Sequence, residues 1–158
     1  MPIINVVSEK GTGFINEHPD LVKLFRNPYN ISYEEYMSAK NEFGQDRSYN
    51  DIVWYIFGKR EREGAPKRNI ALYRATFLKR ENRFADSLYQ YIVVLFYDVN
   101  DDFDEIAPGI RSAIYEMKEY FSPEMVARCY DRIDIKKKVS KASFEAVVDS
   151  VLRDEVQK

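Results

Sequence analysis

The sequence predicts an all-α fold, a single domain of about six to seven helices packed as antiparallel helical hairpins. Apolar residues recur at three- and four-residue spacings within short segments, which is the helical period. Capping and stop signals separate these segments at short intervals, so short turns join the helices. The length of 158 residues allows one domain with its own core, but not two well-buried domains and a linker.

The N-terminal region precedes the first helix signal. We expect residues 1–17 to form a flexible or extended segment. Pro19 stands at a first-turn position and predicts a short helix that ends before Pro28. No basic residues precede the apolar residues of Met1–Val7, so the sequence predicts no signal peptide.

Two capping motifs predict the next two helices. The stretch Ser32–Glu35 has capping-box spacing, in which the hydroxyl accepts a backbone N–H and the carboxylate reaches back. That helix runs to about Phe43 and stops at Gly44, because glycine accommodates a helix end. The stretch Ser48–Asp51 repeats the pattern and opens a helix that ends within the polar stretch 58–64.

The segments 67–80 and 84–98 predict a helical hairpin. Lys67–Arg80 has one apolar face at helical spacing, and a three-residue turn follows it. Phe84–Asp98 is apolar almost all round, and by local preference Tyr91–Tyr97 alone fits a buried strand equally well. Its length and the absence of a neighbouring partner strand favour helix. Because such a helix must be covered on several sides, we expect it to be the central helix of the domain.

Three further helices are predicted in the C-terminal third. Proline or serine marks each of their starts, and apolar residues follow at helical spacing. They are a helix capped by Asp104 or Ala107 that runs to Tyr120, a helix that begins at Ser122–Pro123, and an amphipathic helix from Ser143 to about Glu155.

The stretch from about Asn69 to Asn100 resembles one degenerate tetratricopeptide repeat. The residues that carry the resemblance are Ala75, Leu78, Phe84, Ser87 and Tyr91, which stand at the small, apolar and aromatic positions of that repeat. The sequence departs from the pattern where Val94 replaces a small residue and Val99 replaces a proline. The resemblance implies a tetratricopeptide-like hairpin over residues 67–100, with two closely packed antiparallel helices.

A wider resemblance covers more of the chain. It is similar to a group of uncharacterised, helical bacterial and phage-associated proteins in the stretches Tyr49–Trp54, Leu72–Arg74, Phe96–Asn100 and Ala107–Ile110. This resemblance implies a helical fold and a phage or prophage origin, and it supplies no activity and no site residues.

Residue types that carry chemistry are scarce or badly spaced. The sequence has one cysteine, Cys129, and one histidine, His18, so a catalytic dyad or a metal cage has few components. Gly11–Gly13 lacks the third glycine of a dinucleotide loop. Oxygen ligands alternate from Asp98 to Asp104 as in a calcium loop, but Phe103 stands where that loop needs glycine. The sequence therefore predicts neither an enzyme nor a bound metal or cofactor, and a buried, inert thiol at Cys129.

Charge is balanced overall but uneven along the chain. The formal net charge is −2, which gives no global attraction to polyanions. Residues 58–83 are strongly basic, and the acidic segment 98–105 follows the second hairpin helix, so we expect a domain with one basic and one acidic end. The candidate contacts for phosphate or for a partner are Lys59, Arg60, Arg62, Lys67, Arg68, Arg80 and Arg83.

Aromatic residues form 15% of the chain, and several have no predicted core role. The candidate interaction aromatics are Tyr33, Tyr49, Tyr89 and Tyr130, with Tyr29 also unassigned. The favoured function is a non-catalytic protein-interaction or adaptor module in the cytoplasm, whose partner is another protein or a second copy in a homodimer, and not a membrane. Two alternatives stay open: a nucleic-acid-associated factor that uses the basic segment 59–83, and a phage-encoded inhibitor of a host protein.

Overall fold

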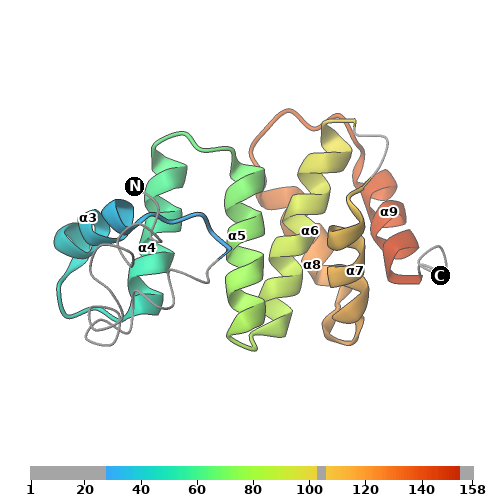
Figure 1. Ribbon diagram of the computed structural model, residues 1–158. Coiled ribbons are helices and arrows are strands. Elements are labelled where there is room, and N and C mark those ends of the chain that lie inside the picture. The colour runs from blue at the N-terminus through green and yellow to red at the C-terminus, as the bar shows by residue number, and fades with distance from the viewer. Residues whose placement is uncertain (1–27, 103–105, 154–158) are drawn as a thin grey trace. The chain divides into compact units, whose positions relative to one another are not determined.

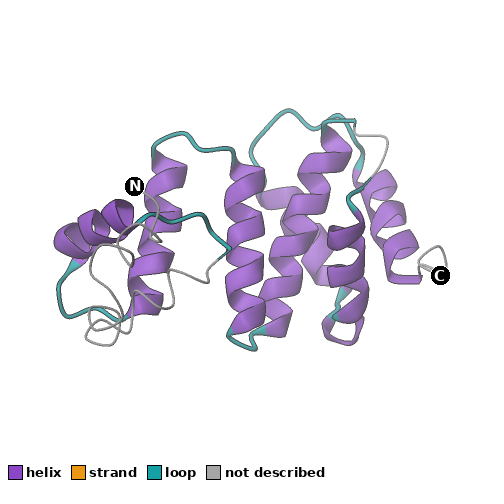
Figure 2. Cartoon of the chain, in the orientation of Figure 1, coloured by secondary structure: helices purple, strands orange, loops and turns teal. Residues whose placement is uncertain are grey.

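The computed structural model describes residues 28–102 and 106–153, and over these residues all regular structure is helical (Figures 1 and 2). The all-α prediction is therefore confirmed for the described residues. The α-helices are α3 (Tyr33–Phe43), α4 (Tyr49–Arg62), α5 (Lys67–Arg80), α6 (Phe84–Asn100), α7 (Pro108–Glu116), α8 (Pro123–Arg132) and α9 (Lys141–Arg153), with a short 3₁₀ helix η1 at Lys118–Tyr120.

Several sequence predictions lie outside the described residues. They are the N-terminal segment 1–17, the helix after Pro19, His18, the glycine pair and Asp104. The chain divides into two compact units, Met1–Ala65 and Pro66–Lys158, so the expected single domain stays a prediction. None of the described helices is long and apolar enough to cross a membrane.

Unit 1 contains α3 and α4, and serine caps both helices as the sequence predicts. The Ser32 hydroxyl accepts from the Glu35 backbone N–H at 3.0 Å, and the Ser48 hydroxyl accepts from Asp51 at 3.2 Å. The α3 helix ends at Gly44, whose φ of 147° is one that side chains rarely allow. Buried residues of α3, of α4 and of the segment before them form the core of this unit; they are Tyr29, Ile31, Tyr36, Ala39, Tyr49, Ile52, Val53, Ile56 and Phe57.

Unit 2 begins with the predicted hairpin, in which α5 and α6 lie side by side and antiparallel (Figure 1). Their bounds agree with the prediction at every end but one, where α6 continues to Asn100. The buried Ser87 hydroxyl donates to the Ala75 carbonyl across the hairpin at 2.7 Å. Small residues thus permit a close helix contact here, whereas the tetratricopeptide-like arrangement itself stays a prediction.

Helix α6 is the centre of unit 2. It contacts α5, α7, α8 and α9, and its residues Leu88, Ile92, Leu95 and Phe96 are fully buried. Phe96 packs edge-on against Phe144 of α9, with ring centroids 5.2 Å apart. The prediction of a central helix over the alternative of a buried strand is therefore confirmed for this unit.

Two C-terminal boundaries differ from the sequence prediction. The helix predicted to reach Tyr120 stops at Glu116, and η1 follows, because Met117 turns its backbone N–H to the Ala113 and Ile114 carbonyls as a cap. Helix α9 begins two residues before Ser143, because the Ser140 hydroxyl accepts from the Ser143 backbone N–H at 3.1 Å. The capping serine is therefore Ser140.

Candidate functional site

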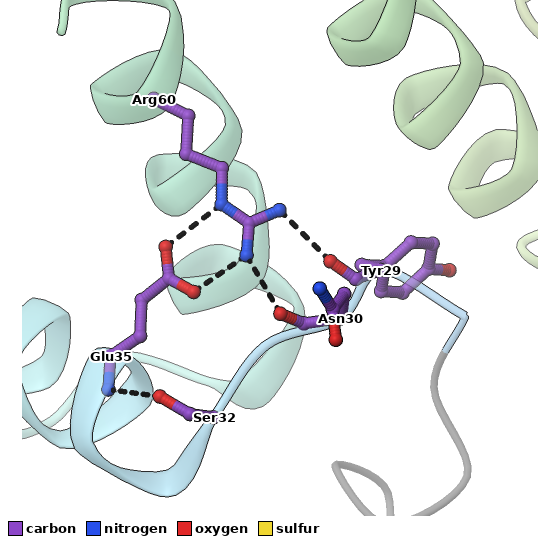
Figure 3. Close-up of polar contacts among 5 residues, drawn as sticks. All are labelled: Tyr29, Asn30, Ser32, Glu35 and Arg60. Atoms are coloured by element: carbon purple, nitrogen blue, oxygen red, sulfur yellow. Dashed lines mark hydrogen bonds and ion pairs between the residues drawn. The ribbon is translucent and has the colours of Figure 1, made fainter. Parts of the chain in front are cut away.

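Arg60 of the predicted basic segment is an internal clamp of unit 1 (Figure 3). Its guanidinium donates to both carboxylate oxygens of Glu35, at 2.8 and 2.6 Å, and to the Tyr29 and Asn30 carbonyls, at 2.9 and 3.1 Å. Only 17% of the Arg60 side chain is exposed. The Glu35 carboxylate therefore binds Arg60 and does not reach back to its own helix start, as a capping box requires. This arginine is a poor candidate for a partner contact.

Arg68 is likewise committed inside unit 2. Its guanidinium donates to both carboxylate oxygens of Asp98, at 2.7 and 3.2 Å, and Asp98 is only 3% exposed. The hydrogen bond from Asp98 raises the pKa of Arg68. Because Arg68 lies at the start of α5 and Asp98 at the end of α6, the pair fastens one end of the hairpin.

The cations of the basic segment do not all gather at one end of the hairpin, although its turn and the acidic end of α6 do lie at opposite ends, as predicted. An antiparallel hairpin places Lys67 and Arg68 beside the acidic end of α6, and it leaves Arg80 and Arg83 at the opposite end. Four of the seven candidate cations have carboxylate partners, since Lys59 pairs with Glu42 and Arg83 with Asp86 in addition to the two pairs above. Of the remaining cations of that set, Arg62 belongs to unit 1, and Lys67 and Arg80 lie at opposite ends of α5 in unit 2.

The candidate interaction aromatics have different surroundings from those expected. Tyr49 is buried and stacks on Tyr36 at 5.9 Å, and Tyr29 is buried against Phe57, so both belong to the core. Tyr130 is half-buried, packs edge-on against Phe96 and donates its hydroxyl to the Val139 carbonyl at 2.8 Å. The prediction that these three tyrosines have no core role is therefore wrong.

The other two candidate tyrosines are half-buried. The Arg128 guanidinium lies over the Tyr89 ring, 4.3 Å from its centroid. Tyr33 begins α3.

A half-exposed aromatic surface lies on unit 1 around Arg62, one of the candidate cations. The Phe43 and Tyr55 rings stack with centroids 4.5 Å apart and planes 15° apart. The Arg47 guanidinium lies 4.8 Å from the Phe43 centroid, and the Arg62 guanidinium lies 5.7 Å from the Tyr55 centroid. Trp54, the only tryptophan, is 38% exposed. We call these five residues the aromatic–arginine face.

Helical spacing brings the α4 members of this face together. Trp54, Gly58 and Arg62 are four residues apart and occupy one side of α4, with Tyr55 beside them. A Cβ at Gly58 would lie 3.4 Å from the Arg62 guanidinium, so the glycine leaves room for Arg62 to lie along the helix. The spacing of these three residues is visible in the sequence and was the signal that could have indicated this face.

A hydrogen-bonded group of charges borders the aromatic–arginine face. The Glu42 carboxylate accepts from the Lys59 ammonium at 2.7 Å and from the Tyr55 hydroxyl at 2.8 Å. These two hydrogen bonds lower the pKa of Glu42, and the same contacts raise the pKa of Lys59 and of Tyr55. The group fixes the Tyr55 ring against Phe43, so the stacked pair presents a defined surface.

The residues that the sequence analysis considered for chemistry or metal binding have structural roles where the structure describes them. Cys129 is buried, and burial raises the pKa of its thiol to about 12, which agrees with the predicted inert thiol. Asp98 and Asn100, the first two residues of the calcium-like pattern, lie inside α6, and their side chains bind Arg68 and the backbone of residues 136 and 138. Within residues 28–102 and 106–153, no group of three or more His, Cys, Asp or Glu side chains has the arrangement of a metal site.

Comparison with protein-family models, with curated proteins and with solved structures finds no match to this chain.

Proposed function

We propose that the chain is a protein-interaction module and that the aromatic–arginine face of unit 1 is its contact surface. The observation that carries the proposal is the Phe43–Tyr55 stack with a guanidinium near each ring, on the same helix pair that exposes Trp54. Tryptophan, tyrosine and arginine are the residue types that dominate binding energy at protein interfaces, and this face combines all three. The Trp54 ring packs edge-on against the buried Phe57, with centroids 5.9 Å apart, and its exposed part is available to a partner.

The surroundings of the face also fit an interface. The Lys59–Glu42 ion pair borders the stacked rings, as polar pairs border the core of many interfaces. Because the rings are already held by neighbouring side chains, a partner would bind them at low cost in side-chain entropy. This mode of action requires no catalytic group.

The proposal is tested by capturing binding proteins from an extract of the cell that makes this chain. The compared baits are the wild-type chain, the single variants Trp54→Ala and Arg62→Glu, and a control, Tyr120→Ala, which removes an exposed aromatic side chain of unit 2. We expect a protein that the wild type and the control retain and that both α4 variants lose, with a fall in affinity of about thirtyfold. Retention of the same proteins by all four baits, or recovery of the bait alone, would contradict the proposal.

A further inference from the structure

Among the described residues, the longest run of cations without ion-pair partners lies outside the predicted basic segment, on α8 and the loop after it. Arg128 and Arg132 are four residues apart on the exposed side of α8, and three consecutive lysines follow. We call Arg128, Arg132, Lys136, Lys137 and Lys138 the α8 basic strip. Within the part of the chain that the structure describes, none of these five cations forms an ion pair with a carboxylate.

The backbone of the lysine loop is fixed from within the core. The buried Asn100 side chain accepts from the Lys138 backbone N–H at 2.7 Å and donates to the Lys136 carbonyl at 3.1 Å. The Tyr130 hydroxyl donates a hydrogen bond to the Val139 carbonyl, just after the lysines, at 2.8 Å. The loop therefore presents its lysines from a fixed backbone, which lowers the entropy lost on binding a ligand.

Two aromatic rings lie under cations of the strip. The Arg128 guanidinium is 4.3 Å from the Tyr89 centroid, and the Lys137 ammonium is 5.1 Å from the Tyr130 centroid. Nucleic-acid bases stack on tyrosine rings and on guanidinium planes, whereas phosphates bind lysine and arginine. The strip thus offers both kinds of contact that a single strand uses.

We propose that the α8 basic strip binds single-stranded nucleic acid, with the phosphates on the lysine loop and a base on Arg128 and Tyr89. An anionic membrane fits less well, because Ile135 is the one large apolar side chain exposed in the described part of this loop. An acidic protein would use the cations without the rings. The site differs from the basic segment 59–83, and it does not depend on the aromatic–arginine face.

Nearby carboxylates set the path of the ligand. Asp131 is paired with Lys141 at 3.3 Å, and Asp134 lies between α8 and the lysines. Asp101 and Asp102 are exposed and directly follow Asn100, which places them at the side of the loop toward α6. Their charge repels phosphate there, so the strand runs along α8 and leaves the end of α6 free.

The test measures fluorescence anisotropy of a labelled oligothymidylate upon addition of the full chain at low salt. The triple variant Lys136→Gln, Lys137→Gln, Lys138→Gln is compared with a control of equal charge change, Lys59→Gln, Lys67→Gln, Arg80→Gln. We expect the loop variant to bind about tenfold or more weakly, and the slope of log K against log salt to fall by about two. The control should stay within about twofold of wild type, since none of its cations belongs to the α8 basic strip.

A variant that is expected to bind more tightly keeps the test decisive even if the triple variants lose little affinity for the oligonucleotide. Asp101→Asn with Asp102→Asn removes the repelling charges at exposed positions, and we expect it to bind the oligonucleotide a few-fold more tightly. Circular dichroism and thermal melting of each variant verify that the fold is retained.

Four results would overturn the proposal. They are no binding at low salt, equal losses in the two triple variants, binding to phosphatidylserine vesicles without binding to the oligonucleotide, and competition by polyglutamate as effective as that by unlabelled oligonucleotide. The third result would identify a membrane surface as the ligand, and the fourth would identify an acidic polypeptide.

Discussion

Unit 1 places its aromatic rings in pairs between chain segments, whereas unit 2 surrounds one apolar helix with four others. Among the described residues of unit 1, the ring pairs that join different segments are Tyr29 with Phe57, Tyr36 with Tyr49 and Phe43 with Tyr55. In unit 2, α6 contacts α5, α7, α8 and α9. The described part of unit 1 has only two helices, so it contains no helix that is surrounded by others. Its large aromatic rings therefore supply much of its buried apolar area.

Both units contain cations tied to carboxylates, and unit 2 also contains a group of cations without such partners among the described residues. In unit 1, Arg60 is tied to a carboxylate and two carbonyls, and Lys59 to Glu42, so these charges hold the fold. In unit 2 the α8 basic strip has no such ties among the described residues. The number of basic residues in a stretch of sequence is therefore a poor guide to how many cations a ligand can contact. Some of these cations form ion pairs with carboxylates that lie far away in the sequence.

The chain contains one natural reporter for each unit, Trp54 in unit 1 and Cys129 in unit 2. The largest expected effect is on Cys129. Burial raises the pKa of its thiol from an ordinary value of 9.0 to about 12. At pH 8 the native chain should therefore react with a thiol reagent about a thousandfold more slowly than the chain in urea, because only the thiolate reacts.

The reaction rate of the Cys129 thiol with Ellman's reagent is measured at increasing urea concentrations, and Trp54 fluorescence is followed in parallel. A fast reaction without denaturant would show that the α8 region opens easily, and it would remove the distinction between a tightly enclosed unit 2 and a more open unit 1. Coincident transitions of the two reporters would instead support the single domain expected from the sequence.

The next largest effect concerns the ion pair between α5 and α6. Arg68→Leu leaves the 3% exposed Asp98 without its partner, and we expect it to lower the free energy of unfolding by about 3 kcal/mol. The double variant Arg68→Leu, Asp98→Leu should be more stable than the single variant, since it removes the buried charge as well. Urea titrations with Cys129 as the reporter measure both values. A double variant less stable than the single one would show that the pair does more than neutralise Asp98.

Most helices could be predicted from the sequence because their signals are local. The Ser32 and Ser48 caps, the stop at Gly44 and the hairpin turn after Arg80 depend on residues within four positions of one another. The enclosed α6 was also predictable, since a helix that is apolar all round must be covered by neighbouring helices to leave water.

The site residues were less predictable, because their roles depend on contacts between distant positions. Arg60 contacts residues 25 to 31 positions earlier, and Arg68 contacts Asp98 30 positions later. Nothing in the local sequence separates such an arginine from an exposed one. The same holds for Tyr49. Its neighbours in the sequence are polar, so nothing local indicates that its ring stacks on Tyr36. Asn100 gave a misleading signal, since its place in an acidic run suggested a metal ligand while its side chain holds a loop.

The smallest of the three effects separates two arginines that are two residues apart. Arg60→Ala removes the clamp on Glu35, Tyr29 and Asn30, and we expect it to lower the free energy of unfolding of unit 1 by about 2 kcal/mol. Arg62→Ala removes only an exposed side chain over Tyr55, so its effect on stability should stay within about 0.5 kcal/mol. Trp54 fluorescence during urea titration measures both.

Arg60→Lys extends this comparison, because lysine keeps the charge and loses the planar fork. A guanidinium satisfies a carboxylate and two carbonyls at once, whereas an ammonium on a shorter group cannot reach all three. We therefore expect Arg60→Lys to be nearly as unstable as Arg60→Ala. Full rescue by lysine would mean that the attraction to Glu35 alone holds unit 1, and that the two carbonyl contacts contribute nothing measurable. Equal stability of the Arg60 and Arg62 variants would remove the distinction between structural and available cations within α4 itself.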